Sequence, residues 1–312
     1  MIKLQKIWGL VLVGMLLMLA PSAQGSDVSE DPEGLFAFVN VTVIPMDEER
    51  LLQGQTVIVK EGVITQIGPT SSINVSAGTI TIDGSDQYLI PALSDMHVHM
   101  EGEAFNIMLP PDEQISADTL NFSKLLFPYI ANGVAMIEVM QALPEHITLR
   151  DRIAGEEILG PRLILSRMID GPDWGWPPPL STWVETAAQA RQAVIDAKKT
   201  GYDRIKVYSF LSQECYDSII ATAKELNMLV DGHIPVSLSL EYILEAGQNL
   251  IAHAEEVMKH AGGDYSEERI DYFAEIIAKS DAWITPTLVT TRAILALFDD
   301  PDGELALSLI HI

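Results

Sequence analysis

The sequence is poor in cysteine and in basic residues. Cys215 is its only cysteine, so the chain can form no intramolecular disulfide and no zinc site built from several thiolates. Any metal ion would have to be held by imidazole, carboxylate or a modified side chain. Lys and Arg number 19 against 44 Asp and Glu, which gives a formal net charge of -25. Nucleic acids and anionic lipid surfaces are polyanions, so this charge argues against both as partners.

Long apolar runs are also scarce, and the clearest one lies at the N-terminus. Lys3 and Lys6 precede the apolar stretch Ile7–Ala20, and small residues follow it. The stretch is shorter than the roughly 20 residues that a transmembrane helix needs. Residues 1–25 therefore resemble a signal peptide, which predicts a secreted or periplasmic protein with no membrane attachment after cleavage. A retained N-terminal anchor is the alternative.

The rest of the chain shows two patterns of hydrophobic residues. In residues 26–88, short β-branched runs separated by glycine-containing turns predict a small N-terminal β-sandwich part. In residues 89–312, apolar strands alternate with amphipathic helices, which predicts a parallel sheet and favours an α/β fold with a TIM-like (β/α)8 barrel. The barrel strands are expected at residues 89–98, 133–140, 161–168, 203–209, 228–233, 249–254 and 282–289.

This pattern supplies seven strands and not eight. A (β/α)8 barrel takes about 250 residues, whereas residues 89–312 supply 224 and finish in the apolar segment LALSLIHI, which ends at Ile312. We interpret the sequence as a piece truncated at its C-terminus, with the last strand or strands missing. A last strand with an unusual sequence is the alternative.

Histidines fall at the ends of the expected barrel strands. His97 and His99 are separated by one residue at the end of the first strand, so their side chains point to the same face. Lys206, His233 and His253 end the fourth, fifth and sixth strands. Chemistry in such barrels is carried out at the C-terminal ends of the strands. A single buried histidine is usually a hydrogen-bonded core residue, but this grouping favours metal binding.

The sequence around these residues resembles the metal-dependent amidohydrolase superfamily, and most closely its imidazolonepropionase-like and Xaa-Pro dipeptidase (prolidase-like) branch. The resemblance extends from about residue 36 to residue 295. The segments that carry it are YLIPALSDMHVH, GPRLILS, YDRIKVYS, LVDGHIP and NLIAHAEEV.

The resemblance implies a site with two divalent metal ions, commonly zinc. His97 and His99 would bind one ion, His233 and His253 the other, and Lys206 would bridge them as a carbamate formed with CO2. A hydroxide shared by the two ions would attack the substrate.

The family also uses an aspartate at the end of the eighth strand as a catalytic residue. In this sequence we expect that aspartate to lie beyond Ile312, the last residue given. The catalytic residue is therefore unknown, and we expect the piece itself to be inactive or poorly active.

The resemblance further implies hydrolysis of an amide bond in a small molecule, either a cyclic amide or a dipeptide such as one ending in proline. A lactone or ester hydrolase using the same site is an alternative, because the fold constrains the reaction only loosely. A barrel that binds a metal or ligand without catalysis is another. Assembly into a homo-oligomer remains open.

Several further residues bear on the substrate. Trp174 and Trp176 lie in a stiff, Pro-rich loop after the third strand, and Tyr208 follows Lys206 on the same face of its strand. All three are candidates for substrate binding, with packing onto the barrel as the alternative.

Four other residues carry weaker expectations. Glu138 stands where the family often has a basic residue, which leaves the preferred substrate charge open. Asp95 is a candidate for orienting His97 or capping the end of the barrel. His146 and His260 are expected at the surface.

Overall fold

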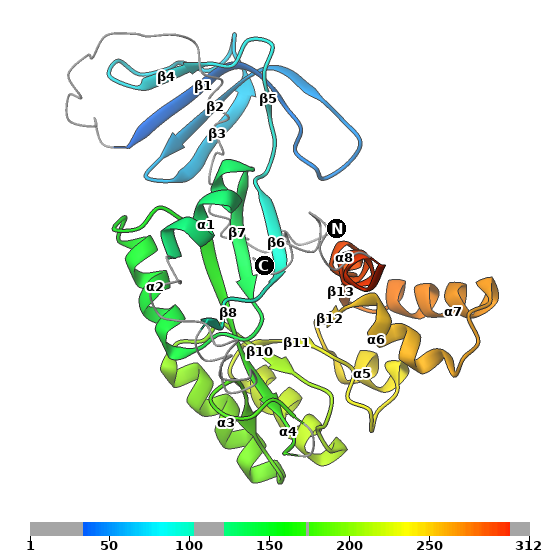
Figure 1. Cartoon of the computed structure of the whole chain (residues 1–312). Coiled ribbons are helices and arrows are strands. Elements are labelled where there is room, and N and C mark those ends of the chain that lie inside the picture. Colours follow the sequence, from blue (N-terminus) through cyan, green and yellow to red (C-terminus); the bar gives the residue numbers. More distant parts are fainter. Residues whose placement is uncertain (1–33, 103–121, 173–174, 300–312) are drawn as a thin grey trace. The chain divides into compact units, whose positions relative to one another are not determined.

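The structure is a computed structural model that describes residues 34–102, 122–172 and 175–299 (Figure 1). It divides into two compact units. The described residues up to Ser94, together with Pro128–Ala135, form the first, and the described residues of Asp95–Phe127 and from Met136 onward form the second. No helix in the described ranges is long and apolar enough to cross a membrane.

The first unit contains one mixed sheet of five strands. The strands are β1 (Leu35–Val43), β2 (Leu52–Lys60), β3 (Val63–Pro69), β4 (Ile80–Asp83) and β5 (Tyr88–Leu89). β2 pairs antiparallel with both β1 and β3, whereas β4 and β5 pair parallel with β1. A tight turn at Glu61–Gly62, where both residues have positive φ, joins β2 to β3; this is the geometry that two-residue hairpins favour. The apolar core of this first unit contains Val41, Val43, Val57 and Val59.

The second sheet follows the predicted strand series closely and forms a nearly closed barrel with helices between its strands. Its order is β13-β12-β11-β10-β8-β7-β6, and the pairs from β7 to β13 are parallel. A short extra strand, β9 (Thr182–Trp183), pairs with β8. The other strands are β6 (Leu93–Val98), β7 (Val134–Val139), β8 (Arg162–Asp170), β10 (Arg204–Val207), β11 (Leu229–Gly232), β12 (Leu250–Ala252) and β13 (Trp283–Thr285).

Two predictions concern the ends of the chain and fall on residues outside the described ranges. The expected signal peptide at residues 1–25 is one of them. The other is the C-terminal truncation, because residues 300–312, ending at Ile312, are also outside those ranges. Both stay predictions.

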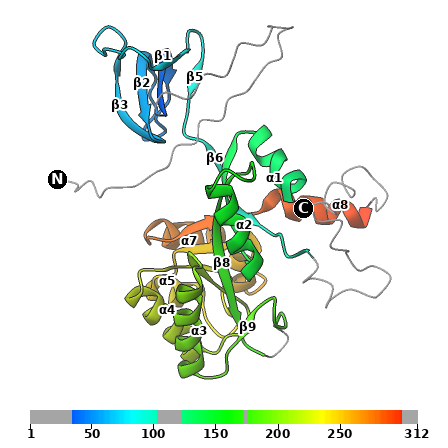
Figure 2. The same cartoon turned by 90° about the vertical axis from the view of Figure 1, so that its left-hand side faces the viewer.

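Helices separate the barrel strands, as the alternating pattern predicts. They are α1 (Phe122–Ala131), α2 (Pro144–Ala154), α3 (Ala187–Thr200), α4 (Gln213–Glu225), α5 (Leu240–Ala246), α6 (Ala254–Met258), the 3₁₀ helix η3 (Lys259–Ala261), α7 (Glu267–Ala278) and α8 (Leu288–Asp299). Ser212 and Ser266 show why α4 and α7 begin where they do, because each side chain accepts a hydrogen bond from a backbone N–H of the first turn. α3 and α4 pack side by side (Figure 1 and Figure 2).

The strand ends of the barrel lie close together at one edge of the sheet. Gly232 ends β11 with a φ of 124°, and a Cβ there would lie 2.2 Å from the carbonyl oxygen of Val207 at the end of β10. Only glycine tolerates both the backbone angle and this close approach. The residue that follows is His233, so the close contact also sets where this histidine leaves the sheet.

Candidate active site

The four histidines at the predicted strand ends come together in the structure. The Nε2 atoms of His97 and His99 lie 3.1 Å apart. The ring centroid of His97 is 4.4 Å from that of His253, and the ring of His253 is 5.0 Å from that of His233. The ends of β6 and of the much later strands β11 and β12 therefore bring four imidazoles to one place.

Lys206 and Tyr208 join this group from β10 and the residues that follow it. Lys206 is 1% exposed, and its Nζ lies 5.5 Å from the centroid of the Tyr208 ring. The Tyr208 ring is in turn 4.0 Å from the ring of His233. A hydrogen bond with Trp176 also involves Tyr208, whereas Trp174 lies outside the described residues. The structure thus brings together every candidate site residue that it describes.

The catalytic aspartate that the family places at the end of the eighth strand is not among these residues. No residue of the described part of the chain, which ends at residue 299, was predicted for this role. The identity of the catalytic proton carrier therefore stays a prediction, and the described site consists of candidate metal-binding and substrate-binding residues.

Two buried carboxylates hold two of the imidazoles. Oε1 of Glu101 lies 2.6 Å from Nδ1 of His99, and Oε1 of Glu256 lies 3.1 Å from Nδ1 of His233. A carboxylate accepts hydrogen bonds, so Nδ1 of each ring carries a proton, and in the neutral ring the lone pair is on Nε2. This arrangement is the usual second layer around metal-binding histidines. Neither carboxylate was predicted from the sequence, although Glu101 extends the two-residue spacing of the histidine pair.

His253 has an oxygen partner of a different kind. Its Nδ1 lies 2.8 Å from Oγ1 of Thr287, and its backbone N–H donates to the carbonyl of Thr285. The residue has a φ of 75°, a conformation that costs a non-glycine residue about 1–3 kcal/mol and often marks functional positions. The strained backbone between β12 and α6 places this ring against His97 and His233.

The buried imidazoles are held in their neutral form. Burial, reinforced by neighbouring positive charge, lowers the pKa of His97 far below its usual range, the pKa of His233 to about 4 and that of His253 to about 3. In the described part of the chain, Nδ1 of His97 and Nε2 of His233 are buried without a hydrogen-bond partner. Neutral imidazoles with free lone pairs are the form that binds metal ions.

Burial also changes the pKa of Lys206. Burial lowers its pKa to about 8, while the carboxylates of Glu101, Glu138 and Glu256 act in the opposite direction. A lysine with this pKa is partly neutral near physiological pH, and a neutral amine can act as a nucleophile. Its chemistry therefore suits reaction with CO2.

These side chains are of the kinds that bind metal ions, but they are not arranged as a complete set of metal ligands. Within residues 34–102, 122–172 and 175–299, no three side chains of His, Cys, Asp or Glu converge in a metal-binding arrangement. The case for a metal site therefore depends on the neutral imidazoles, their free nitrogens and their buried carboxylate partners.

Glu138 does not present its charge to a substrate. It is fully buried on β7, and its carboxylate accepts hydrogen bonds from Ser166 Oγ at 2.7 Å and from Arg204 Nη1 at 3.1 Å. The same Arg204 nitrogen donates to Asp231 at 3.0 Å. Several strands thus contribute to an internal polar cluster, which accounts for the acidic residue at this position.

Three other expectations meet different outcomes. The expectation that His146 lies at the surface is wrong, because the N-terminus of α2 turns its imidazole into the core, where it is 1% exposed. His260 is half-buried and not fully exposed. Asp95 accepts a hydrogen bond from the backbone N–H of His97 at 3.1 Å, so it stabilises the chain beneath that histidine.

Asp170 is a strand-end carboxyl group that was not predicted from the sequence. It ends β8, and its Oδ1 accepts hydrogen bonds from the backbone N–H groups of Gly171 and Phe210. Its Oδ2 has no partner in the described ranges, and burial raises its pKa to about 6. Asp170 therefore ties β8 to the segment that follows Tyr208. Its position at a strand end was the signal that could have identified it.

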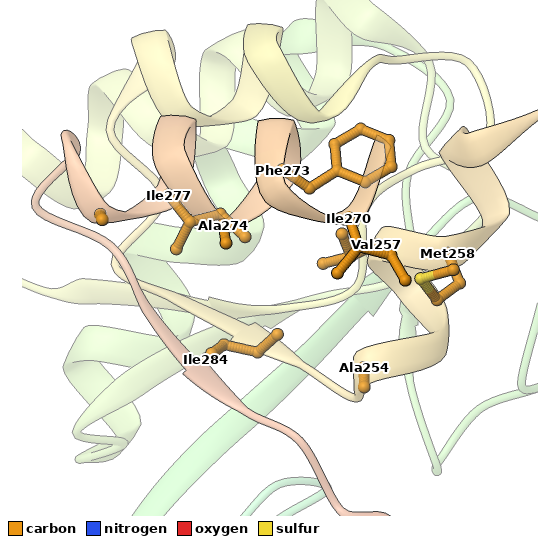
Figure 3. A pocket seen from close by; sticks show the side chains of 9 residues that line it. Ala254, Val257, Met258, Ile270, Phe273, Ala274, Ile277 and Ile284 are labelled. Atoms are coloured by element: carbon orange, nitrogen blue, oxygen red, sulfur yellow. The ribbon is translucent and has the colours of Figure 1, made fainter. Parts of the chain in front are cut away.

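An apolar pocket is lined by residues that begin directly after His253 in the sequence. It contains no reactive side chain. Its volume is about 380 Å³, and α6, α7 and β13 surround it (Figure 3). The lining side chains are those of Ala254, Val257, Met258, Ile270, Phe273, Ala274, Ile277, Ala278 and Ile284.

Comparison with known proteins identifies the architecture. No protein-family model matches the chain, and no curated protein does either. A candidate prolidase from Bifidobacterium longum matches 82% of this chain and 61% of its own at 23% identity, with a TM-score of 0.59. The fold is that of the amidohydrolases and prolidases. The predicted relationship in fold is confirmed.

Two further structures agree. Bottromycin amidohydrolase matches 84% of this chain and 54% of its own at 20% identity, with a TM-score of 0.62. A Xaa-Pro dipeptidase solved with methionine in its active site matches 87% of this chain and 70% of its own at 17% identity, with a TM-score of 0.63. The chain spans less than two thirds of the Bifidobacterium longum protein and of Bottromycin amidohydrolase.

Proposed function

We propose that this chain belongs to a metal-dependent hydrolase that cleaves a C–N bond of an amide. The observation that carries the proposal is the group of four imidazoles and one buried lysine at the ends of parallel barrel strands. Neutral imidazoles packed against one another have little purpose in an apolar core, whereas a metal ion would use their lone pairs. The names of the structural neighbours support the same class of reaction.

The donor residues divide into two sets. His97 and His99 would hold one divalent ion, His233 and His253 would hold the other, and carboxylated Lys206 would join the two sets. Zinc is the metal that we propose, because imidazole suits it and no thiolate is needed. When bound, such ions would supply a Lewis acid and lower the pKa of a water molecule.

The chain's own residues then bind and orient the substrate. Burial raises the pKa of Tyr208, so its phenol remains a hydrogen-bond donor at neutral pH. We propose that it donates to a carbonyl or carboxylate oxygen of the substrate. Glu101 and Glu256 hold the imidazoles of His99 and His233 in orientation. We propose that Trp176, which shares a hydrogen bond with Tyr208, forms an aromatic wall of the substrate site, and Trp174 remains a prediction for the same wall.

The proposed substrate is a small molecule with an amide bond, in particular a dipeptide ending in proline or a cyclic amide. Such substrates have a compact apolar ring, which suits an aromatic wall. A secreted or periplasmic location, based on residues 1–25, remains a prediction, as does assembly into a homo-oligomer.

Metal content tests the proposal directly. The protein without residues 1–25 is prepared with bicarbonate and analysed for metals by elemental analysis. We expect about two ions per chain, and about one or fewer in Lys206→Ala, because the bridging group is lost. Lys199→Ala, an exposed lysine on α3, serves as the matched control and should retain the wild-type content. Well-folded wild-type protein with little or no bound metal would overturn the proposal.

A further inference from the structure

His146 makes two hydrogen bonds that fix the position of its ring proton. The backbone N–H of Leu143 donates to Nδ1 of His146 at 3.0 Å, so this nitrogen carries a lone pair. Nε2 lies 2.9 Å from the carbonyl oxygen of Met100. A carbonyl can only accept, and therefore Nε2 carries the proton and donates it. The imidazole is neutral and makes both of its hydrogen bonds to the backbone.

The second bond reaches the segment that carries the candidate ligand His99. Met100 lies between His99 and Glu101, whose side chains are 2.6 Å apart. The strand contact just before this segment is made by Val98, whose carbonyl accepts from the backbone N–H of Met140. β6 ends at Val98. Beyond this point, the Met100 carbonyl is held by His146, a residue of α2 that follows it by 46 positions.

We propose that His146 is a positioning residue for the pair formed by His99 and Glu101. By fixing the carbonyl between these two residues, it keeps Nδ1–H of His99 directed at the Glu101 carboxylate. Nε2 of His99 then keeps its lone pair for a metal ion. The metal part of this inference rests on the proposed function, whereas the effect of His146 on the His99 ring does not.

The hydrogen bond from Nε2 to Met100 shows that His146 does more than cap the start of α2. The bond from Leu143 to Nδ1 satisfies the start of α2, and a shorter polar side chain would suffice there. The bond from Nε2 adds nothing to the helix and acts only on the segment after β6. Removing partners that orient a metal-binding histidine typically costs about 10–100-fold in metal affinity.

Two substitutions separate the two bonds. In His146→Gln, the amide nitrogen can occupy the place of Nε2 and donate to Met100. In His146→Asn, the amide oxygen can occupy the place of Nδ1 and accept from Leu143, but the side chain is too short to reach Met100. The tautomer of His99 is measured by long-range ¹H–¹⁵N NMR in metal-free protein, and zinc affinity is measured by competition with a chelator.

We expect His146→Gln to keep His99 protonated at Nδ1 and to bind zinc at close to wild-type affinity. We expect His146→Asn to give a mixture of tautomers and zinc binding weakened by about 10–100-fold. A folded His146→Asn variant with the wild-type His99 tautomer would overturn the inference. If His146→Asn fails to fold, the tautomer of His146 in the wild-type protein tests the inference instead. A wild-type His146 protonated at Nδ1 could not make the proposed bond to Met100 and would overturn the inference. Wild-type protein that binds no zinc would refute the proposed function, while the tautomer measurement would still decide the role of His146.

Discussion

Oε1 of Glu256 lies 3.1 Å from Nδ1 of His233, and its Oε2 accepts a hydrogen bond from the backbone N–H of Ile234. One carboxylate on α6 thus holds both the ring and the backbone of the segment that follows β11. Burial alone would raise the pKa of Glu256, but its hydrogen bond with His233 and the ammonium of Lys259 hold it at about 2. The carboxylate therefore remains charged throughout the neutral range and continuously orients the imidazole.

We expect Glu256→Gln to weaken zinc binding by about 10–100-fold, because a neutral amide no longer enforces the ring orientation. Competition with a chelator measures the effect. Glu245→Gln changes an exposed glutamate on α5 and should leave zinc binding unchanged. Equal affinities in wild type and Glu256→Gln would show that the carboxylate does not orient a metal ligand.

The internal cluster around Arg204 leads to a prediction about stability. Arg204→Met leaves the buried Asp231 carboxylate without its cation, so we expect the free energy of unfolding to fall by about 3–5 kcal/mol. Glu138→Gln should cost far less, because burial and the nearby Asp231 raise the pKa of Glu138 to about 8 and the group is mostly protonated at neutral pH. Urea unfolding followed by circular dichroism measures both. An equal loss in the two variants would mean that Glu138 is charged in the folded protein.

Asp170 should make stability depend on pH. Its folded pKa of about 6 lies above the ordinary value of 3.8, so between these two values the folded state binds more protons than the unfolded state. The contribution of Asp170 to the free energy of unfolding is therefore fully present below about pH 4. It falls by about 3 kcal/mol as the pH rises to about 6.

Asp170→Asn keeps an oxygen acceptor but cannot ionise, so its stability should lack this decline. Urea unfolding of both proteins from about pH 4 to about pH 8 tests the difference. The stability of Asp170→Asn relative to wild type should rise across the interval and then level off. A constant difference over the whole range would contradict the prediction.

Two glycines with positive φ allow steric and backbone effects to be separated. Gly247 has a φ of 92°, and a Cβ there would meet no atom of the described residues within 4 Å, whereas a Cβ on Gly232 would meet the Val207 carbonyl. We expect Gly247→Ala to cost about 1–2 kcal/mol from its backbone angle. Gly232→Ala should cost about 1–3 kcal/mol more because of the clash. Thermal unfolding compares them, and equal losses would mean that the strand ends can move apart freely.

Much of the barrel followed from local pattern. Apolar runs that alternate with amphipathic helices located the seven barrel strands to within a few residues, and the two-residue periodicity at the end of β6 put His97 and His99 on one face. Because parallel strands end at one edge, strand position alone was enough to bring Lys206, His233 and His253 toward that pair.

The sequence by itself therefore determined the strand order along the chain and placed the four clustered histidines and Lys206 at strand ends. Only the tertiary structure decided what holds those residues in place. Glu256, Arg204 and His146 act on residues of other elements, and a contact between separate elements depends on packing distances that no local period encodes. This is why His146 looked like a surface residue in sequence and lies in the core, with its proton directed at Met100.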